Sequence, residues 1–372
     1  MGQNARMSRT VYLHIGAPKT GTSYLQDRLR LNKAELRRHG VHYPLGRLNL
    51  HSDHFRPALD LIEKDWGGAL AQAKGQWDAL MRQVRRLDGT VIISHEILAA
   101  ATPEQVARAM ADLEGDEVHV VYSARDLGRQ IPAEWQESIK QRRRWTFKKY
   151  IKNVQTASQS APDLWFWRVQ GLPNVLARWS AVLPPERVHL VTVPPAGAPK
   201  DLLWQRFCTV FGIDPAWAPK ESERRNESMG VEEAALVRRL NARLRKAGVS
   251  GAEHRALVKE LLVHQNLARR RRKTPVTLPP KVYPWAEEVT EEWLTWVAGS
   301  GVDVVGDVTD LRPVAPAPGT PWVNPDRPKQ KVLARAALEG LAVMTAEAAR
   351  RSDPEQQLSG KVTRAVKRMR DH

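Results

Sequence analysis

A lysine, three hydroxyl residues and two glycines lie close together near the start of the chain, in the segment VYLHIGAPKTGTSYLQ of residues 11–26. Gly16 and Gly21 are separated by four residues, and Thr22 and Ser23 follow the second glycine. An apolar run precedes the loop, and a helix-forming sequence follows it. Backbone N–H groups at the start of such a helix point at one spot, where the helix dipole adds partial positive charge. The segment therefore predicts a site for a phosphate or a similar anion.

The position of the lysine separates this loop from that of nucleoside triphosphatases. The usual phosphate loop reads G-x-x-x-x-G-K-[ST], with the lysine directly after the second glycine. Here Thr22 takes that place, and the lysine is Lys19, inside the loop. We expect a lysine at this earlier position to bind a ligand with a shorter phosphate chain. It would lie beside the first phosphate rather than beside the β and γ phosphates.

In this respect the loop resembles the phosphosulfate-binding loop of sulfotransferases, whose pattern is roughly P-K-[ST]-G-[ST]-[ST]-x-L. The matching residues are Pro18, Lys19, Thr20, Gly21, Thr22, Ser23 and Leu25. The resemblance implies a P-loop-type α/β/α fold and transfer of a sulfuryl group from 3′-phosphoadenosine 5′-phosphosulfate (PAPS) to a hydroxyl or amine. It also implies that the loop holds the 5′-phosphate and that Lys19 is catalytic. A fixed ammonium would stabilise the charge that builds on the bridging oxygen as the S–O bond breaks.

The family's second cofactor motif is a strand followed by R-x-P-x-x-R-x-x-S-x-[YW], in which the arginine and the serine hold the 3′-phosphate. We assign Arg125, Arg129 and Trp135 of RDLGRQIPAEW to this motif, with Ala133 at the serine position and with Arg129 one residue ahead of the motif's second arginine, a position that Gln130 fills. Loss of the serine hydrogen bond weakens cofactor binding by about 1.5–3 kcal/mol unless another group replaces it. Arg129 lies one helical turn before Ala133 and is the expected replacement. The alternative for Arg125 is an ion pair with Asp126.

A proton acceptor is expected after the run TVIISHEIL of residues 90–98. Either Glu96 or His95 could accept the proton of the sulfuryl acceptor, and we favour Glu96 as the base. The alternative is that Glu96 caps a helix or pairs with a lysine. His51 and His54 form a second candidate group, and His14 is predicted to be a core residue with a backbone partner. No metal-ligand spacing of Cys and His is present, so we expect no metal.

Strand and helix patterns alternate along the chain, which predicts a mostly parallel sheet covered on both faces. In such sheets ligands bind beyond the carboxyl ends of the strands, where the candidate residues lie. The expected strands are 11–15, 90–98, 117–126 and 186–193, with a short extended piece at 41–44. The expected helices are 22–38, 55–87, 103–113, 127–144 and 201–213.

The resemblance covers residues 9–313, with weaker support from 225–230 and 301–313. The six prolines of 313–328 predict an extended linker over 314–328, followed by a basic helical or disordered tail, 329–372. We expect the tail to contact a partner or an anionic surface. The basic run 269–273 is a further, weaker candidate for the 3′-phosphate.

Composition limits the classes of function. The 372 residues carry a net charge of +17, yet no nucleic-acid-binding motif accompanies the basic residues, so we assign the charge to a polyanionic cofactor or an acidic acceptor. Neither an apolar run of membrane-spanning length nor the apolar core of a signal peptide is present, and we expect a cytoplasmic protein. The only cysteine, Cys208, is expected to be buried. Four tryptophans near 141–149 are candidates to stack against an acceptor, namely Trp135, Trp145, Trp165 and Trp167.

Two other classes of function remain open. A nucleotide kinase or NTPase is disfavoured by the position of Lys19 and by the lack of an aspartate at the end of the 90–95 strand to hold magnesium. A non-catalytic nucleotide-binding protein is suggested by Ala133. The identity of the acceptor is left open, because acceptor pockets are built from variable helices and loops.

Overall fold

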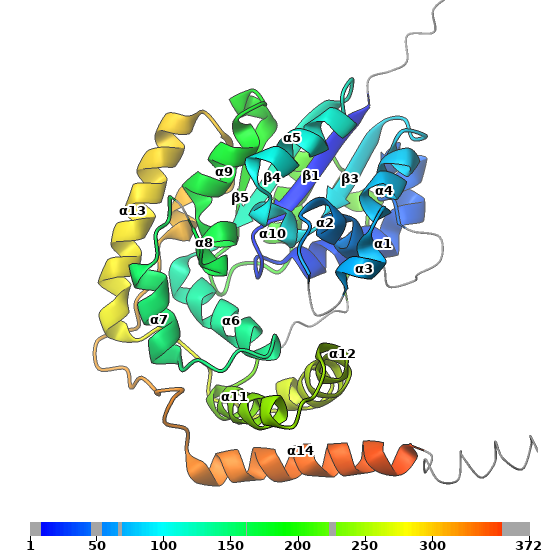
Figure 1. The fold of residues 1–372 in the computed structure, drawn as a ribbon. Helices are drawn as coiled ribbons and strands as arrows, with labels where there is room; N and C mark the ends of the chain where they lie inside the picture. The colour runs from blue at the N-terminus through cyan, green and yellow to red at the C-terminus, as the bar shows by residue number, and fades with distance from the viewer. Residues whose placement is uncertain (1–8, 46–53, 66–68, 161, 223–227, 352–372) are drawn as a thin grey trace, which may run out of the picture. The chain divides into compact units, whose positions relative to one another are not determined.

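The computed structural model describes residues 9–45, 54–65, 69–160, 162–222 and 228–351 (Figure 1). The chain divides into two compact units. The first consists of residues 1–138, 145–226 and 276–322, and the second of 139–144, 227–275 and 323–372. The candidate residues of the loop, of the 90–98 run and of the 125–133 motif all belong to the first unit.

The first unit is built on a six-stranded sheet with the order β2-β3-β1-β4-β5-β6, in which every neighbouring pair is parallel. The strands are β1 Thr10–Gly16, β2 Val41–His42, β3 Thr90–Ser94, β4 Glu117–Ala124, β5 Val188–Thr192 and β6 Asp303–Val305. Strand β1 lies at the centre, so its carboxyl end is flanked by those of β3 and β4.

Helices lie on both faces of this sheet (Figure 1). The helices of the first unit are α1 Thr22–Arg38, α2 Phe55–Leu61, α3 Leu70–Ala73, α4 Gln76–Val84, α5 Pro103–Asp112, α6 Leu127–Lys140, α7 Phe147–Thr156, α8 Trp165–Gln170, α9 Leu172–Ser180, α10 Leu202–Phe211 and α13 Tyr283–Ser300. Short 3₁₀ turns span Glu96–Ala100, Pro185–Arg187, Pro215–Trp217, Pro280–Val282 and Val308–Leu311. The expected α/β class with a parallel central sheet is confirmed.

The core of one face shows why α1 and α10 pack there. Their apolar side chains, among them Leu25, Leu29, Trp204 and Phe207, meet Ile92, Val121 and Val191 from three strands in one buried cluster. The apolar positions of α1 recur at helical spacing, and the side chains of a strand alternate between faces, which places both sets against each other. Cys208 is buried in the same cluster, as the sequence predicts.

Two expectations about elements are wrong in detail, and one strand was missed. Residues 55–87 do not form one helical stretch but the helices α2, α3 and α4, with Gly75 at positive φ before α4. The strand expected over 90–98 ends at Ser94, because His95 caps a 3₁₀ turn. The edge strand β6 was not predicted, since three residues carry too little alternation to be recognised.

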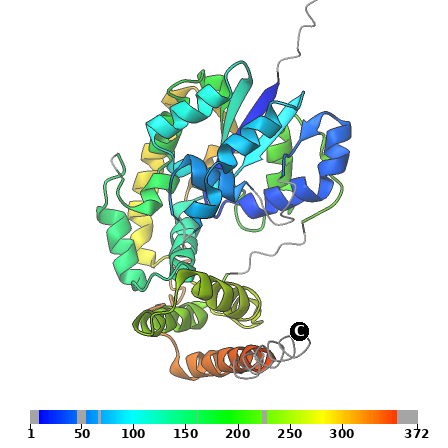
Figure 2. The ribbon, with the colours of Figure 1, turned by 45° about the vertical axis from the view of Figure 1, so that its right-hand side comes forward.

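The second unit is helical. It contains α11 Val231–Lys246, α12 Gly251–Glu253, a π-helix His254–His264, a 3₁₀ turn Leu267–Arg269 and α14 Gln330–Arg350. Helix α14, drawn in orange, packs against α11 and the π-helix (Figure 2). Between the described helices, residues 313–328 contain no regular element. No helix in the described part of the chain combines the length and the apolar character needed to cross a bilayer.

Candidate anion-binding site

The glycine loop connects the centre of the sheet to a helix N-terminus. Strand β1 ends at Gly16, and Gly21 is the N-cap of α1, with no side-chain hydrogen bond to the cap. Both glycines have positive φ, 106° and 94°. A Cβ on Gly16 would lie 2.9 Å from the Cα of Glu96, and one on Gly21 would lie 2.6 Å from Cδ2 of Leu203. The loop therefore needs glycine at both ends and leaves the first N–H groups of α1 without a side-chain acceptor.

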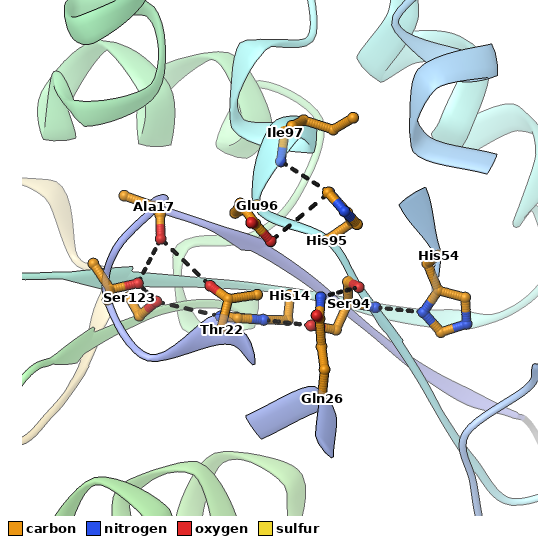
Figure 3. A network of polar contacts seen from close by, with 11 residues as sticks. His14, Ala17, Thr22, Gln26, His54, Ser94, His95, Glu96, Ile97 and Ser123 are labelled. Atoms are coloured by element: carbon orange, nitrogen blue, oxygen red, sulfur yellow. Dashed lines mark hydrogen bonds and ion pairs between the residues drawn. The ribbon is translucent and has the colours of Figure 1, made fainter. Parts of the chain in front are cut away.

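A buried polar network supports the loop from below (Figure 3). The Thr20 hydroxyl lies 2.5 Å from the carbonyl oxygen of Ala17 and 2.6 Å from the Ser123 hydroxyl. The N–H of Ala17 donates to the carbonyl of Ser123 at 2.6 Å, which ties the loop to β4. Because the Thr20 side chain is fully buried in these contacts, its hydroxyl belongs to the loop's own structure. Only its backbone N–H remains for a ligand.

His14 lies beneath this network and stays neutral. Its Nδ1 is 2.7 Å from the Ser94 hydroxyl, and its Nε2 is 3.3 Å from the Ser123 hydroxyl. Burial lowers the pKa of His14, nearby His95 acts in the same direction, and together they bring it to about 3. The sequence correctly predicts a core residue in the sheet, but its partners are two hydroxyls and not the backbone group that was expected.

Two glutamines hold the loop through hydrogen bonds to one of its carbonyl groups. Neither was predicted from the sequence. Nε2 of Gln130, on α6, and Nε2 of Gln170, on α8, donate to the carbonyl of Pro18 at 2.6 and 3.0 Å. Pro18 thus fixes the loop through its backbone oxygen. Of the expected hydroxyl donors, Thr22 is buried with its hydroxyl 3.5 Å from the carbonyl of Ala17. Ser23 is partly exposed, and its hydroxyl has no partner among the described residues.

Lys19 lies in a group of carboxylates. Its Nζ is 2.6 Å from Oε2 of Glu137 on α6, and about a third of its side chain is exposed. Burial acts to lower the pKa of Lys19, but the carboxylates of Glu137, Glu134 and Glu96 outweigh it, and the pKa is raised. Lys19 is therefore a permanent cation at the mouth of the loop.

Glu134 is the titratable group that sequence reasoning missed. It is buried on α6, and its Oε1 accepts a hydrogen bond from Nε2 of Gln170 at 3.4 Å. Burial raises its pKa to about 7, while Lys19 acts to lower it and Glu137 to raise it. The available signal was the spacing of Glu134 and Glu137, three residues apart on the helix that follows Arg125.

Arg125 is joined to the loop through a glutamine. Its Nε donates to Oε1 of Gln130 at 2.9 Å, and Gln130 holds the carbonyl of Pro18. A second nitrogen, Nη2, donates to the carbonyl of Arg129 at 3.1 Å. Arg125 forms no ion pair within the described part of the chain, so the alternative of an Asp126 pair is not realised. Burial and neighbouring Arg129 lower its pKa to about 10, which leaves it charged.

The expectation that Arg129 replaces the missing serine is wrong, because its guanidinium is already committed. Its Nε is paired with Asp126, its Nη1 donates to the carbonyl of Pro194 at 3.0 Å, and its own N–H donates to Asp126 at 2.8 Å. Arg129 therefore fastens the start of α6 to the loop after β5. Ala133 is partly exposed on the same helix. The Ser138 hydroxyl donates to the carbonyl of Trp135, so it does not replace the missing serine either.

The two candidate bases lie at the end of β3 (Figure 3). Nδ1 of His95 accepts the N–H of Ile97 at 3.3 Å and lies 3.8 Å from Oε2 of Glu96. That Glu96 oxygen is buried and has no hydrogen-bond partner in the described structure. Oε2 of Glu96 is therefore open to a hydrogen-bond donor on a bound group.

His54 is not placed to act as a base, because both of its ring nitrogens are engaged. Its Nδ1 accepts the N–H of Ser94 at 3.0 Å, its Nε2 lies 2.5 Å from the carbonyl of Pro44, and burial lowers its pKa to about 4. The ring therefore holds the β3 end in place. His51 lies outside the described residues.

The expected tryptophan platform is wrong for two of its four members. Trp135 and Trp167 are fully buried, and the indole N–H of Trp167 donates to the carbonyl of Val154 at 2.7 Å. Trp145 donates to the Ser138 hydroxyl at 2.8 Å, and the Lys64 ammonium lies 4.1 Å from the ring centre of Trp165. No group of three or more His, Cys, Asp or Glu in the described residues is placed to hold a metal ion.

Comparisons with known proteins give little. No family model and no curated protein matches the chain. Among solved structures, the sulfotransferase domain from the curacin biosynthetic pathway aligns with 59% of this chain and 80% of its own length, at 13% identity and a TM-score of 0.28. This is a weak structural likeness to a sulfotransferase domain.

Proposed function

We propose that the first unit binds PAPS and transfers its sulfuryl group to a hydroxyl or amine. The observation that carries the proposal is the pairing of two cations around the loop. Lys19 lies inside the loop, and Arg125 is a partly buried guanidinium without a carboxylate among the described residues, joined to the same loop through Gln130. Two anionic groups on one ligand, a 5′-phosphosulfate and a 3′-phosphate, fit these two cations.

The donors present suit such a ligand. The N–H groups at the start of α1 and the Ser23 hydroxyl would hold the 5′-phosphate, and Arg125 would hold the 3′-phosphate. Ala133 removes one hydroxyl from the expected set, and no described group replaces it. Ligands that carry only a 5′-phosphate would leave Arg125 unused, which is the basis for preferring an adenosine 3′,5′-bisphosphate over ATP.

The chain's own groups then have definite tasks. PAPS, when bound, would supply the sulfuryl group, which would pass from the bridging oxygen of the 5′-phosphate to the acceptor oxygen or nitrogen. Lys19 would stabilise the charge left on the bridging oxygen. Glu96 would take the proton from the acceptor at its undonated Oε2. The pKa of Glu134 is raised, so its protonation state would determine how much negative charge lies around Lys19.

Calorimetric titration with adenosine 3′,5′-bisphosphate and with ATP–magnesium tests this function without knowledge of the acceptor. We expect micromolar affinity for the bisphosphate, weak affinity for ATP–magnesium, and loss of bisphosphate binding in Lys19→Ala. Lys33→Ala, an exposed substitution on α1, is the control. Tighter binding of ATP–magnesium would make the protein a kinase or NTPase, and no binding of either would refute the proposal.

A further inference from the structure

Nearly all of the chain's net charge belongs to the second unit. Its residues include 27 Lys and Arg against 11 Asp and Glu, a net charge of +16 out of +17 for the whole chain. In the described residues of this unit the ratio is 22 to 7. The unit with the proposed cofactor site is therefore almost neutral, so a polyanionic cofactor does not explain the basic composition. A second anionic partner is needed.

At least half of the 22 described cations are free to meet such a partner. In the described residues, the following are exposed and have no carboxylate partner: Arg144, Arg239, Arg243, Arg245, Lys246, Arg269, Arg271, Arg272, Lys331, Arg335 and Arg350. Arg270 is the exception in the run 269–273, because Glu233 and Glu339 hold it inside the unit. A field of unpaired cations on one unit attracts an extended anionic surface.

Helix α14 adds an apolar face to this field. Leu333, Ala336 and Gly340 are buried on one side, against α11 and the π-helix. On the opposite side Leu338 and Leu341 are 68% and 63% exposed, and they belong to the few large apolar side chains exposed in the described structure. At 100° per residue, Lys331 falls on the same side as these leucines, and Arg335 lies about 60° around the helix from Leu338. The outward face of α14 thus combines leucine with lysine and arginine.

We propose that the second unit docks on an anionic phospholipid surface through the outward face of α14 and the exposed Arg269, Arg271 and Arg272, which are the neighbours of the Arg270 that is paired with Glu339 on α14. Such a membrane surface offers phosphate to the cations and an apolar layer to Leu338 and Leu341. A nucleic acid would use the cations and leave both leucines in water. A second copy of the unit would bring +16 against +16, which opposes pairing through this face.

Vesicle co-sedimentation of the full-length protein tests the proposal. One vesicle is pure phosphatidylcholine and the other contains phosphatidylglycerol as well. Two variants remove one part of the surface each: Leu338→Ser with Leu341→Ser, and Arg269→Ala with Arg271→Ala and Arg272→Ala. Their matched controls carry the same changes at exposed sites of the first unit, Val182→Ser with Val314→Ser, and Arg37→Ala with Arg82→Ala and Arg86→Ala.

We expect binding only to the phosphatidylglycerol vesicles, weakened by added salt. The leucine variant should lose about tenfold in affinity, and the arginine variant roughly 100-fold, while both controls bind like the wild type. Unchanged circular dichroism would show that the exposed substitutions leave the fold intact.

The proposal is overturned if the anionic vesicles do not bind the protein, or if the controls lose as much affinity as the variants. It is equally overturned if the leucine variant keeps full vesicle affinity, or if an oligonucleotide binds more tightly than the vesicles. It is also overturned if the only effect of the leucine variant is to convert a homodimer into monomers.

Discussion

Nζ of Lys19 lies 2.6 Å from Oε2 of Glu137, so the cation of the glycine loop is paired with a carboxylate on α6. Both side chains are partly exposed, at 33% and 21%. An anion that enters the loop must therefore compete with Glu137 for the ammonium. The ion pair keeps the lysine directed at the loop in the absence of ligand, at the cost of a negative charge close to the proposed phosphate site.

Replacement of Glu137 is expected to strengthen anion binding. In Glu137→Gln the ammonium loses its competitor and the site loses one negative charge, so the affinity for adenosine 3′,5′-bisphosphate should rise by about three- to tenfold. Calorimetry measures the change, and Glu104→Gln, an exposed position on α5, is the control. A drop in affinity would mean that Glu137 orients Lys19 and does not compete with the ligand.

Glu134 should make stability fall as pH rises. Its pKa in the folded protein is about 7, against 4.5 for an ordinary glutamate. Between these values the unfolded chain releases the proton while the folded chain keeps it, so the free energy of unfolding decreases as the pH goes from about 4.5 to about 7 and then levels off. Glu134→Gln stays neutral throughout and should gain at most about 3 kcal/mol relative to wild type at about pH 8. Urea unfolding at about pH 5 and about pH 8 would show it. The same pH dependence in both proteins would argue against a titrating Glu134.

The requirement for glycine at position 16 can be measured against a second glycine. Gly16 and Gly40 both have positive φ, but a Cβ on Gly16 meets the backbone of Glu96 and one on Gly40 meets nothing within 4 Å. Gly40→Ala should cost about 1–2 kcal/mol of stability from the strained φ alone. Gly16→Ala should cost more and should also weaken bisphosphate binding. Equal losses of stability in the two variants would mean that the loop can shift away from Glu96.

The hydroxyls of Thr20 and Ser23 should behave differently although they are three residues apart. Thr20→Val removes the buried bonds to Ala17 and Ser123 and should lower stability by about 1–3 kcal/mol. Ser23→Ala removes a hydroxyl without a partner in the described structure, so stability should change by less than about 0.5 kcal/mol. Bisphosphate affinity should fall by about tenfold in Ser23→Ala. Thermal melts and calorimetry on both variants separate the two roles, and unchanged affinity in Ser23→Ala would remove Ser23 from the site.

The sequence predicts the loop well because its chemistry is local. Glycine spacing, a preceding apolar strand and a following helix are all encoded within residues 11–38, and the parallel sheet follows from the alternation of strands and helices. The same reasoning places Glu96 and Arg125 at strand ends that flank β1, and the observed strand order β3-β1-β4 brings these ends together.

The parts that sequence did not predict depend on tertiary contacts. Gln130 and Gln170 reach the same carbonyl from helices 40 residues apart, and no local pattern indicates that. The commitment of Arg129 to Asp126 and Pro194 is a choice of side-chain direction, which spacing on a helix does not determine. The raised pKa of Glu134 comes from burial, and a glutamate in an amphipathic helix reads as exposed until the packing is known.

The role of Arg125 gives the most direct test of the proposed cofactor class. The measurement is the affinity of the wild type and of Arg125→Gln for adenosine 3′,5′-bisphosphate and for adenosine 5′-monophosphate, with Arg37→Gln as the control. If Arg125 holds a 3′-phosphate, the wild type prefers the bisphosphate, and the variant loses about 10- to 100-fold for the bisphosphate and almost nothing for the monophosphate. If both ligands lose affinity by the same factor, or neither loses any, Arg125 does not hold a 3′-phosphate, and the assignment to PAPS chemistry fails.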